Sequence, residues 1–473
     1  MKFFLYAVAL IVLAGNLVCC QTSAIDNRRI TLSFTEDVDL TQDEILEDLS
    51  YRMEFSIGNV EDISVDGQTV TLTFTDVVTE IGELAFECLS SLTSITLPNS
   101  VTKIGGYAFE SCSSLTSISI PNSVTEIGDW AFEDCSSLTS ITIPNSMTGI
   151  GYRTFYNCSS LTSVTIPNSV IYIGNGAFYN CSSLASITIP DSVTGIGDYA
   201  FAECSSLTSV TIPNSVTMIG FTAFADCSSL TSVTIPNSVT EIGYGAFSGC
   251  SSLRNFSSKF ASADGRCLIT NGKLIAFAGA GLSNYTIPNT VTKIGSNAFE
   301  DCSSLTSISI PNSVTEIGNH AFADCSSLTS ISIPNSVTEI GEGAFEGCSS
   351  LRNFSSKFAS TDGRCLIING ELIAFAGAGL SNYTIPNTVT KIGSQAFAEC
   401  SSLTSVTIPN SVTQIGDAAF EDCSSLTSIT IPNSVTEIGT TAFAECPLES
   451  VTVSRNAEIA EDSFDETTHV IYQ

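Results

Sequence analysis

Hydrophobic residues recur along most of this 473-residue chain with a fixed period of 23. From Leu115 the order is L-x-x-I-x-I-P-x-x-V-x-x-I-G-x-x-A-F-x-x-C. Its first part is the pattern of a short strand with one buried side. The proline that follows cannot donate to a β-ladder, so it turns the chain. One such coil cannot enclose its own apolar residues and must stack on its neighbours, so the period predicts a solenoid.

Prolines mark this period and also show where it is interrupted. They fall into three groups with a step of 23 inside each group, and the step between groups is 52, which is 23 plus 29. The groups are Pro98, Pro121, Pro144, Pro167, Pro190, Pro213 and Pro236; then Pro288, Pro311 and Pro334; then Pro386, Pro409 and Pro432. Each long coil holds an Asn-Gly pair between alternating apolar residues, the strongest short-range signal for a β-hairpin. We therefore predict hairpin units near residues 254–281 and 352–379.

This repeat resembles the BspA-like, or Treponema-type, leucine-rich repeat, and the resemblance covers about 400 residues from roughly Thr69 onward. It implies an α/β repeat solenoid: a curved, right-handed array with a parallel sheet on the concave side, helical or 3-10 turns on the convex side, and hairpin interruptions. Members of the family are typically cell-surface or secreted proteins of bacteria and of some parasitic protists. Several are adhesins for host matrix proteins. Such a resemblance defines the fold better than the ligand.

The two ends of the chain depart from the repeat. Residues 1–20 combine one lysine with an apolar run and are typical of a secretory signal peptide, with cleavage expected between 20 and 24. A lipid-bearing Cys20 is the alternative, although Cys19 directly before it fits that pattern poorly. Residues 25–68 predict a β-α-β-β cap, and residues 69–473 the solenoid, with its first strand already in register with the coils and a C-terminal cap at 447–473. We expect a secreted, extracellular or cell-surface protein without a transmembrane segment.

The charge balance limits the kinds of partner. Asp plus Glu number 48 against 16 Lys plus Arg, which gives a net charge of −32. This argues against nucleic acid, because phosphate binding needs a basic face, and against anionic lipid surfaces. Acidic residues often precede the repeated cysteine, but no calcium-loop spacing is present, so we favour a solvated edge over a metal site. The expected partner is an extracellular protein or glycan.

Catalytic residues are not indicated. A nucleophilic Ser or Cys needs a base, and the only histidines, His320 and His469, lie in no motif. Catalysis also needs one differentiated site, whereas this chain repeats nearly identical ones. We predict a protein that is not an enzyme and that has no cofactor and no metal.

Two sets of residues are candidates for ligand contact. The first is the polar side of the repeated strands, where hydroxyl rows form; it includes Ser117, Ser119, Ser140, Thr142, Ser163 and Thr165. Such rows suit polysaccharide, extended protein or ice, although Ser and Thr are also ordinary solvent-facing strand residues. The second set concentrates rare basic and aromatic residues in the hairpin units: Lys259, Phe260, Arg266 and Lys273 in the first and Arg364 in the second. These could contact a partner or pack the hairpin onto the solenoid.

A cysteine closes nearly every coil, and this row includes Cys112, Cys135, Cys158, Cys181, Cys204 and Cys227. Equivalent residues of neighbouring coils should have Cβ atoms about 4.8 Å apart, whereas a disulfide needs about 3.8 Å. We therefore expect buried thiols that pack as a structural ladder rather than coil-to-coil disulfides.

Six Asn-x-Ser/Thr sequons are candidate glycosylation sites, unless they arise by chance in an Asn- and Ser-rich chain: Asn157, Asn180, Asn255, Asn284, Asn353 and Asn382. Taken together, these observations predict a non-catalytic adhesion or binding protein. The alternatives are a structural spacer of an extracellular matrix and a protein that binds ice or polysaccharide through its Ser/Thr rows.

Overall fold

The computed structural model describes residues 27–35 and 60–473. The predicted signal peptide, and the helix expected in the N-terminal cap, lie outside the described residues. The chain divides into two compact units. Unit 1 comprises Met1–Cys250 and Ser257–Lys259, and unit 2 comprises Ser251–Phe256 and Phe260–Gln473.

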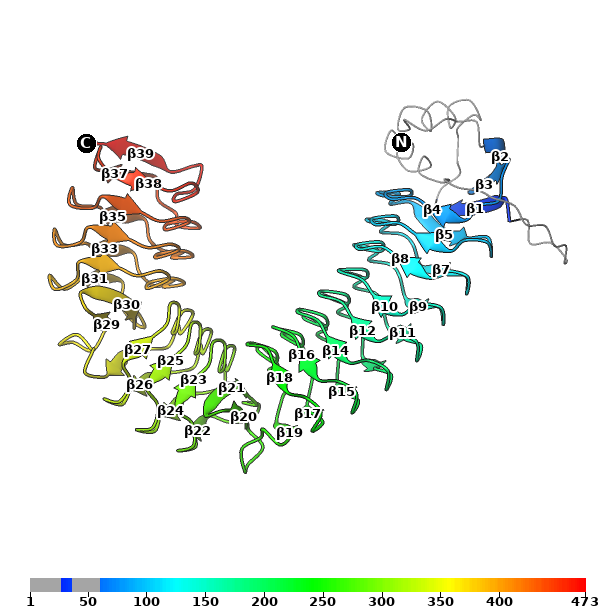
Figure 1. Cartoon of the computed structure of the whole chain (residues 1–473). Helices are drawn as coiled ribbons and strands as arrows, with labels where there is room; N and C mark the ends of the chain where they lie inside the picture. The colour runs from blue at the N-terminus through cyan, green and yellow to red at the C-terminus, as the bar shows by residue number, and fades with distance from the viewer. Residues whose placement is uncertain (1–26, 36–59) are drawn as a thin grey trace. The chain divides into compact units, whose positions relative to one another are not determined.

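Unit 1 is a stack of coils in which one short strand recurs once per coil (Figure 1). We call this row of strands the first sheet. Its hydrogen-bonded pairs run parallel and join equivalent residues, as in Ser163 with Ser140 and Thr165 with Thr142. In each three-residue strand the central residue points inward and its neighbours point to solvent, as the alternation predicts. The strands are β5 (Leu92–Thr96), β7 (Ser117–Ser119), β9 (Ser140–Thr142), β11 (Ser163–Thr165), β13 (Ser186–Thr188), β15 (Ser209–Thr211) and β17 (Ser232–Thr234). The row is divided into β5-β7, β9-β11 and β13-β15-β17.

A second row of parallel strands, which was not predicted from the sequence and which we call the second sheet, runs along the same coils. Its strands have only two residues each, so no alternation is visible in the sequence. They are β4 (Glu80–Ile81), β6 (Lys103–Ile104), β8 (Glu126–Ile127), β10 (Gly149–Ile150), β12 (Tyr172–Ile173), β14 (Gly195–Ile196), β16 (Met218–Ile219) and β18 (Glu241–Ile242). This row is divided into β4-β6-β8 and β10-β12-β14-β16-β18. Threonines that precede the strands extend the sheet, as where the Thr125 hydroxyl donates to the Thr102 carbonyl at 3.2 Å.

The rest of each coil consists of tight turns, so the predicted helical or 3-10 turns are wrong for the described residues. Around Phe132, Trp130 and Asp134 have φ values of 56° and 57°, a left-handed backbone that a right-handed helix does not contain. The Phe132 N–H donates to the Thr154 carbonyl of the next coil at 2.9 Å, and the Glu133 N–H donates within its own turn at 3.0 Å. Alternate amides therefore bond along the stacking axis. A helix would instead keep these bonds within one coil.

The core of unit 1 is a column of phenylalanine rings, one from each coil. Neighbouring rings are stacked, with centroids 5.1 Å apart for Phe109 and Phe132 and 5.4 Å apart for Phe132 and Phe155. Phe155 is fully buried. The column continues through Phe86, Phe178, Phe201, Phe224 and Phe247. Each ring therefore buries its faces against the adjacent coils, which couples their stability.

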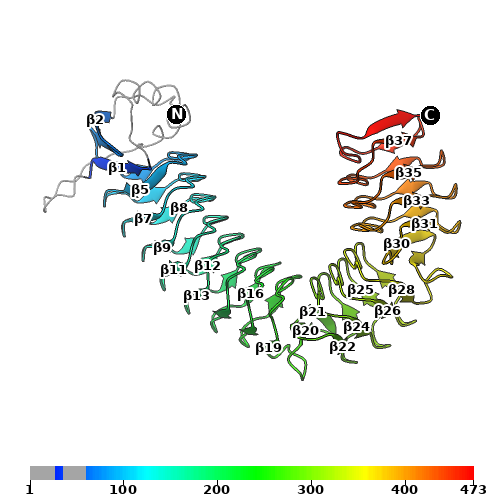
Figure 2. The ribbon, with the colours of Figure 1, turned by 180° about the vertical axis from the view of Figure 1, so that it is seen from behind.

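An antiparallel group of strands covers the first coil of unit 1. It consists of β1 (Arg29–Phe34), β2 (Val60–Asp66) and β3 (Thr69–Phe74) in the order β2-β3-β1-β5. Figure 2 shows β1 beside β5, and β1 is antiparallel both to β3 and to β5. Contrary to the sequence expectation, residues 69–74 are therefore not in register with the coils. The antiparallel β1 separates them from the parallel stack, which begins with β5.

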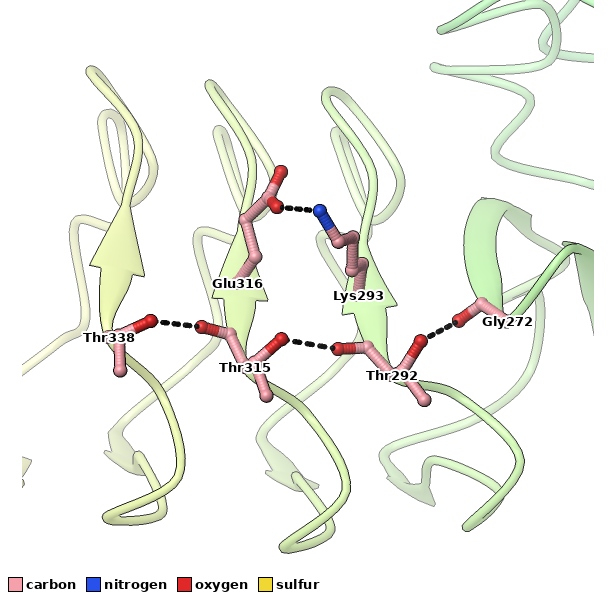
Figure 3. A network of polar contacts seen from close by, with 6 residues as sticks. All are labelled: Gly272, Thr292, Lys293, Thr315, Glu316 and Thr338. Carbon is pink, nitrogen blue, oxygen red and sulfur yellow. Dashed lines mark hydrogen bonds and ion pairs between the residues drawn. The ribbon is translucent and has the colours of Figure 1, made fainter.

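Unit 2 repeats the same coils but contains two β-hairpins. They are β20 (Cys267–Thr270) with β21 (Lys273–Phe277) and β29 (Cys365–Ile368) with β30 (Glu371–Phe375). The second strand of each hairpin pairs in parallel with the next second-sheet strand, so it occupies that strand's place in its coil. Figure 3 shows the result. The Thr338 hydroxyl donates to the Thr315 carbonyl, the Thr315 hydroxyl to the Thr292 carbonyl, and the Thr292 hydroxyl to the hairpin carbonyl of Gly272, each at a distance of 3.2 Å.

The first strand of each hairpin is antiparallel and begins a sheet, so the second-sheet strands of unit 2 form two separate sheets. One continues with β23 (Lys293–Ile294), β25 (Glu316–Ile317) and β27 (Glu339–Ile340), the other with β32 (Lys391–Ile392), β34 (Gln414–Ile415), β36 (Glu437–Ile438) and β38 (Glu458–Ile459). The first-sheet strands are β19 (Asn255–Ser257), where the two units meet in the sequence, then β22 (Asn284–Thr286), β24 (Ser307–Ser309), β26 (Ser330–Ser332), β28 (Asn353–Ser355), β31 (Asn382–Thr384), β33 (Ser405–Thr407), β35 (Ser428–Thr430), β37 (Ser450–Val453) and β39 (His469–Tyr472).

Replacing Phe155 by Ala should leave a cavity in the middle of the ring column and lower the free energy of unfolding by about 3–5 kcal/mol. Urea unfolding followed by circular dichroism measures this loss. Tyr244→Ala is the matched control, because this ring is 47% exposed, and it should change stability by less than about 0.5 kcal/mol. Equal losses in the two variants would show that the ring column does not hold the coils together.

Candidate functional site

The exposed side of the first sheet carries the hydroxyl rows that the sequence analysis singled out. In β9 and β11 the outward residues Ser140, Thr142, Ser163 and Thr165 are exposed. Strand β7 adds Ser117 and Ser119 to the same side, and all three strands are visible in sequence order in Figure 1. Because the register joins equivalent positions, one row consists of Ser140, Ser163 and Ser117 and the other of Thr142, Thr165 and Ser119, which gives a ligand a hydroxyl at the same two positions in each of these coils.

Four of the six sequon asparagines lie at the serine position of first-sheet strands and are exposed: Asn255, Asn284, Asn353 and Asn382. The other two lie in turns and are half-buried. The Asn180 Nδ2 donates to the Asn157 Oδ1 at 2.7 Å, and the Asn157 Nδ2 donates to the Asp134 Oδ1 at 2.5 Å. A glycan on either of these amides would compete with that ladder, whereas the four strand positions are open to solvent.

The basic residues of the hairpin units are largely engaged inside the chain. The Arg266 guanidinium donates to the carbonyls of Ala278 and Ala280 at 2.8 and 3.1 Å, and Arg364 makes the same two bonds in the second unit. The Lys259 ammonium donates to the Asn237 carbonyl at 2.7 Å. Phe260 and Lys273 are half-buried, and the Phe260 carbonyl accepts the Ile269 N–H at 2.8 Å. These contacts favour the packing interpretation of the hairpin residues over ligand contact.

Each hairpin also contains a buried cysteine beside a tyrosine and an aspartate. The Cys267 Sγ lies 3.3 Å from the Tyr285 hydroxyl, which donates to the Asp264 carboxylate at 3.0 Å. Burial raises the pKa of Cys267 to about 12. Burial alone would also raise the pKa of Asp264, but hydrogen bonds from Ser262 and from the Arg266 N–H lower it overall. The thiol is therefore protonated at neutral pH and is a poor nucleophile, and the second hairpin repeats the arrangement with Cys365, Tyr383 and Asp362.

The repeated cysteines form a ladder of thiols in the core. None of the sixteen cysteines of the described residues forms a disulfide. In eleven coils the thiol donates to the carbonyl of the phenylalanine 26 residues earlier, as Cys158 does to Phe132 at 3.2 Å; the donors are Cys112, Cys135, Cys158, Cys181, Cys204, Cys227, Cys250, Cys325, Cys348, Cys423 and Cys446. Burial raises the pKa of Cys204 to about 12, so these thiols act as packing groups rather than as reactive ones.

Three row cysteines differ from the rest in their exposure. Cys88, in the first coil, is exposed, and Cys302 and Cys400, in the coils that directly follow the hairpins, are half-buried. In the native protein, iodoacetamide should therefore modify Cys88 first, and Cys88→Ser should remove the fast phase. In urea without a reductant, all sixteen should react, as counted by mass spectrometry of peptides. A low count in urea would instead show disulfides.

The acidic residues of the turns in unit 1 repel one another. Burial, together with the carboxylates of Glu110 and Asp134, raises the pKa of Glu133 from about 4.5 to about 7. Burial and the carboxylates of Glu87 and Asp134 also raise the pKa of Glu110. Within the described residues, no group of three or more His, Cys, Asp or Glu side chains has a geometry that could hold a metal ion.

This raised pKa gives a pH dependence with a defined sign. Between about pH 4.5 and 7 the folded protein holds a proton on Glu133 that the unfolded chain releases, so the unfolding free energy falls as the pH rises through that window. The urea midpoint should be higher at pH 5 than at pH 8, and Glu133→Gln should reduce this difference and raise the midpoint at pH 8. The exposed Glu241→Gln is the control. An unchanged pH difference in Glu133→Gln would contradict the assignment.

The two histidines do not form a catalytic pair with a nucleophile. The His320 Nδ1 lies 3.1 Å from the Glu346 carboxylate, and this hydrogen bond raises the pKa of His320. His469 is an exposed residue of β39. In the part of the chain that the structure describes, no helix has the length and apolar character to cross a membrane.

Parallel strands repeated every 23 residues around a leucine-lined core define a leucine-rich-repeat solenoid, here of about 17 turns. The model of the BspA-type leucine-rich-repeat region matches residues 66–185, 148–263, 273–365 and 371–471. The chain therefore belongs to the BspA-type leucine-rich-repeat family. Proteins of this kind are typically surface or protein-interaction proteins and are generally non-catalytic.

Two solved structures illustrate this relationship. A leucine-rich repeat protein from Bacteroides ovatus is 29% identical over 89% of this chain and 100% of its own, with a TM-score of 0.45. A leucine-rich cell surface protein from Faecalibacterium prausnitzii is 32% identical over 78% of this chain and 85% of its own, with a TM-score of 0.47. Among curated protein sequences, none matches this chain.

Proposed function

We propose that this chain is a secreted or cell-surface binding protein that holds an extended protein or glycan along the exposed side of its first sheet. The observation that carries the proposal is the pair of in-register rows of exposed Ser and Thr side chains. A hydroxyl is both a donor and an acceptor, so each coil offers the same small set of hydrogen bonds to a repetitive ligand.

Repetition compensates for the weakness of each contact. A solvent-exposed hydrogen bond contributes little by itself, because water competes for both partners. When one ligand spans several coils, the later contacts form at high effective concentration, and the affinity rises with the number of coils engaged. The net charge of −32 favours neutral or cationic ligands over anionic ones.

The test is to immobilise the mature chain and to screen extracellular-matrix proteins and neutral glycans by surface plasmon resonance. Ser140→Arg with Ser163→Arg places two bulky side chains on the sheet and should weaken binding of a captured ligand about tenfold or more. Asn145→Arg with Asn168→Arg adds the same charges to exposed turn residues of the same coils and should leave binding unchanged.

Other outcomes would overturn the proposal in distinct ways. Binding that survives the sheet variants but is lost when residues 254–281 and 352–379 are replaced by 23-residue coils would place the site on the hairpins. A folded chain that binds none of the ligands would be a structural spacer. Thermal hysteresis of ice growth, with no binding to the matrix proteins and glycans, would make the rows an ice-binding face.

A further inference from the structure

The second sheet carries a row of charged side chains that is interrupted in the middle of unit 1. At the outward position of its strands, Lys103 lies 3.5 Å from Glu80 and 3.4 Å from Glu126, and in unit 2 Lys293 pairs with Glu316. In four consecutive strands, β10, β12, β14 and β16, the same position holds Gly149, Tyr172, Gly195 and Met218. The charges are therefore absent from one continuous stretch of this surface.

Exposed apolar side chains gather around that stretch. The structure has ten large exposed hydrophobic side chains among its described residues, and five of them fall between residues 152 and 221. Ile171 is 55% exposed and Tyr199 is 43% exposed. We define the apolar patch as Tyr152, Ile171, Tyr172, Tyr199, Met218 and Phe221. The turn positions of unit 2 that correspond to Tyr199 and Phe221 hold polar or small residues, such as Asn297 and Thr440.

Internal contacts join neighbouring members of the patch across the coils. A Cβ atom added to Gly195 would lie 3.1 Å from ring carbons of Tyr172 and 3.7 Å from the Met218 Cε. The Tyr172 ring therefore lies against the backbone of β14, in the space that glycine leaves open. Tyr199 and Phe221 meet edge to face with centroids 5.3 Å apart. The strands that carry Tyr172, Gly195 and Met218 are neighbours in the sheet order β10-β12-β14-β16-β18 (Figure 1).

Carboxylates border the patch. The Asp129 Oδ1 accepts the Tyr152 N–H at 2.8 Å, and the Asp198 Oδ1 accepts the Phe221 N–H at 2.7 Å. Glu241 is the exposed strand residue beside Met218. Arg153, the only Lys or Arg between residues 104 and 253, lies over the rings of Tyr152 and Tyr156, with its guanidinium carbon 5.2 and 4.7 Å from their centroids. An apolar centre with a mainly acidic border results.

This composition selects one kind of partner. Tyr, Phe and Met are enriched, and charges depleted, at the centres of protein–protein interfaces. A glycan fits less well, because Ile171, Met218 and Phe221 offer no hydrogen bonds to the hydroxyls that binding would desolvate. A second copy of this chain would bring two acidic borders together, which like charges oppose.

We propose that the apolar patch is a docking site for a partner protein that presents an apolar centre flanked by lysine or arginine. This inference rests on the proposed function, because it assumes a binding protein, and it adds a second contact surface that is separate from the hydroxyl rows. Apolar burial supplies affinity at the centre, and the carboxylate border sets the orientation and the rate of encounter.

The chain contains its own reporter for this site. Its single tryptophan, Trp130, packs edge to face against Tyr152 of the patch, with ring centroids 4.8 Å apart. A partner that covers Tyr152 should change the emission of Trp130. The probe is an amphipathic Leu/Lys peptide without aromatic residues, titrated into the full chain, with the matching Leu/Glu peptide for comparison.

The Leu/Lys peptide should shift Trp130 emission saturably, and the Leu/Glu peptide should not. The double variant Tyr172→Ser with Phe221→Ser should lower the affinity for the Leu/Lys peptide about tenfold or more. The double variant Asp198→Asn with Glu241→Gln should lower this affinity about threefold and make it less dependent on salt concentration. The chain itself tolerates an amide at this turn position, since the Asn175 Oδ1 accepts the Asp198 N–H at 3.0 Å. Thermal unfolding checks that the variants fold.

Matched variants in unit 2 separate docking from general attraction to an acidic protein. Gln414→Ser changes the β34 residue that corresponds to Tyr172, and Asp417→Asn with Glu437→Gln removes equivalent charges; all of these should leave the affinity unchanged. If the variants in unit 2 lower the affinity for the Leu/Lys peptide as much as those in unit 1, or if the peptide does not shift Trp130 emission in the native chain, the docking proposal is wrong. The pair Ser140→Arg and Ser163→Arg should not affect the peptide, so loss of the matrix ligand and loss of peptide binding report separately on the two proposals.

Discussion

Backbone hydrogen bonding along the stacking axis is the interaction on which this structure depends. A coil of 23 residues has too few bonds of its own to satisfy its amides, and its neighbours supply the rest at matching positions. The Phe132 N–H donates to the next coil, and the Thr125 N–H donates to the previous one. Equivalent side chains are therefore forced into columns. The ring stack, the thiol ladder and the hydroxyl rows all follow from that single constraint.

The same constraint explains what the sequence could predict. Proline spacing and apolar periodicity are sufficient for the stack and for the strands of the first sheet, because both depend on one-dimensional order. The turns around Trp130 and Asp134 were predicted wrongly, because the choice between helix and turn depends on bonds to a neighbouring coil. The second sheet was missed because two-residue strands show no period. The place of β1 between β3 and β5 is a long-range pairing without a local signal.

The candidate sites were predicted less evenly than the fold. Exposure of Ser140 and Thr142 follows from strand alternation and could be expected. The engagement of Arg266 with hairpin carbonyls could not be expected, because composition shows a rare basic residue but not where its donors point. The apolar patch could be predicted from the sequence only by comparing the same position in successive coils. At the position of Tyr172 most other strands carry Glu or Lys, and the change is meaningful because it continues through adjacent coils.

The hairpins also affect how such a chain can grow. The Asn-Gly turns lie 98 residues apart, at Asn271 and Asn369, and each hairpin starts a new sheet with an antiparallel strand. A block of 98 residues therefore contains one hairpin, whose first strand forms the edge of a sheet, and the coil that follows the block is equivalent to the coil with which the block began. Inserting or deleting one whole block leaves the chemistry of every remaining junction as it was. The number of coils in the molecule is therefore adjustable in units that need no new cap.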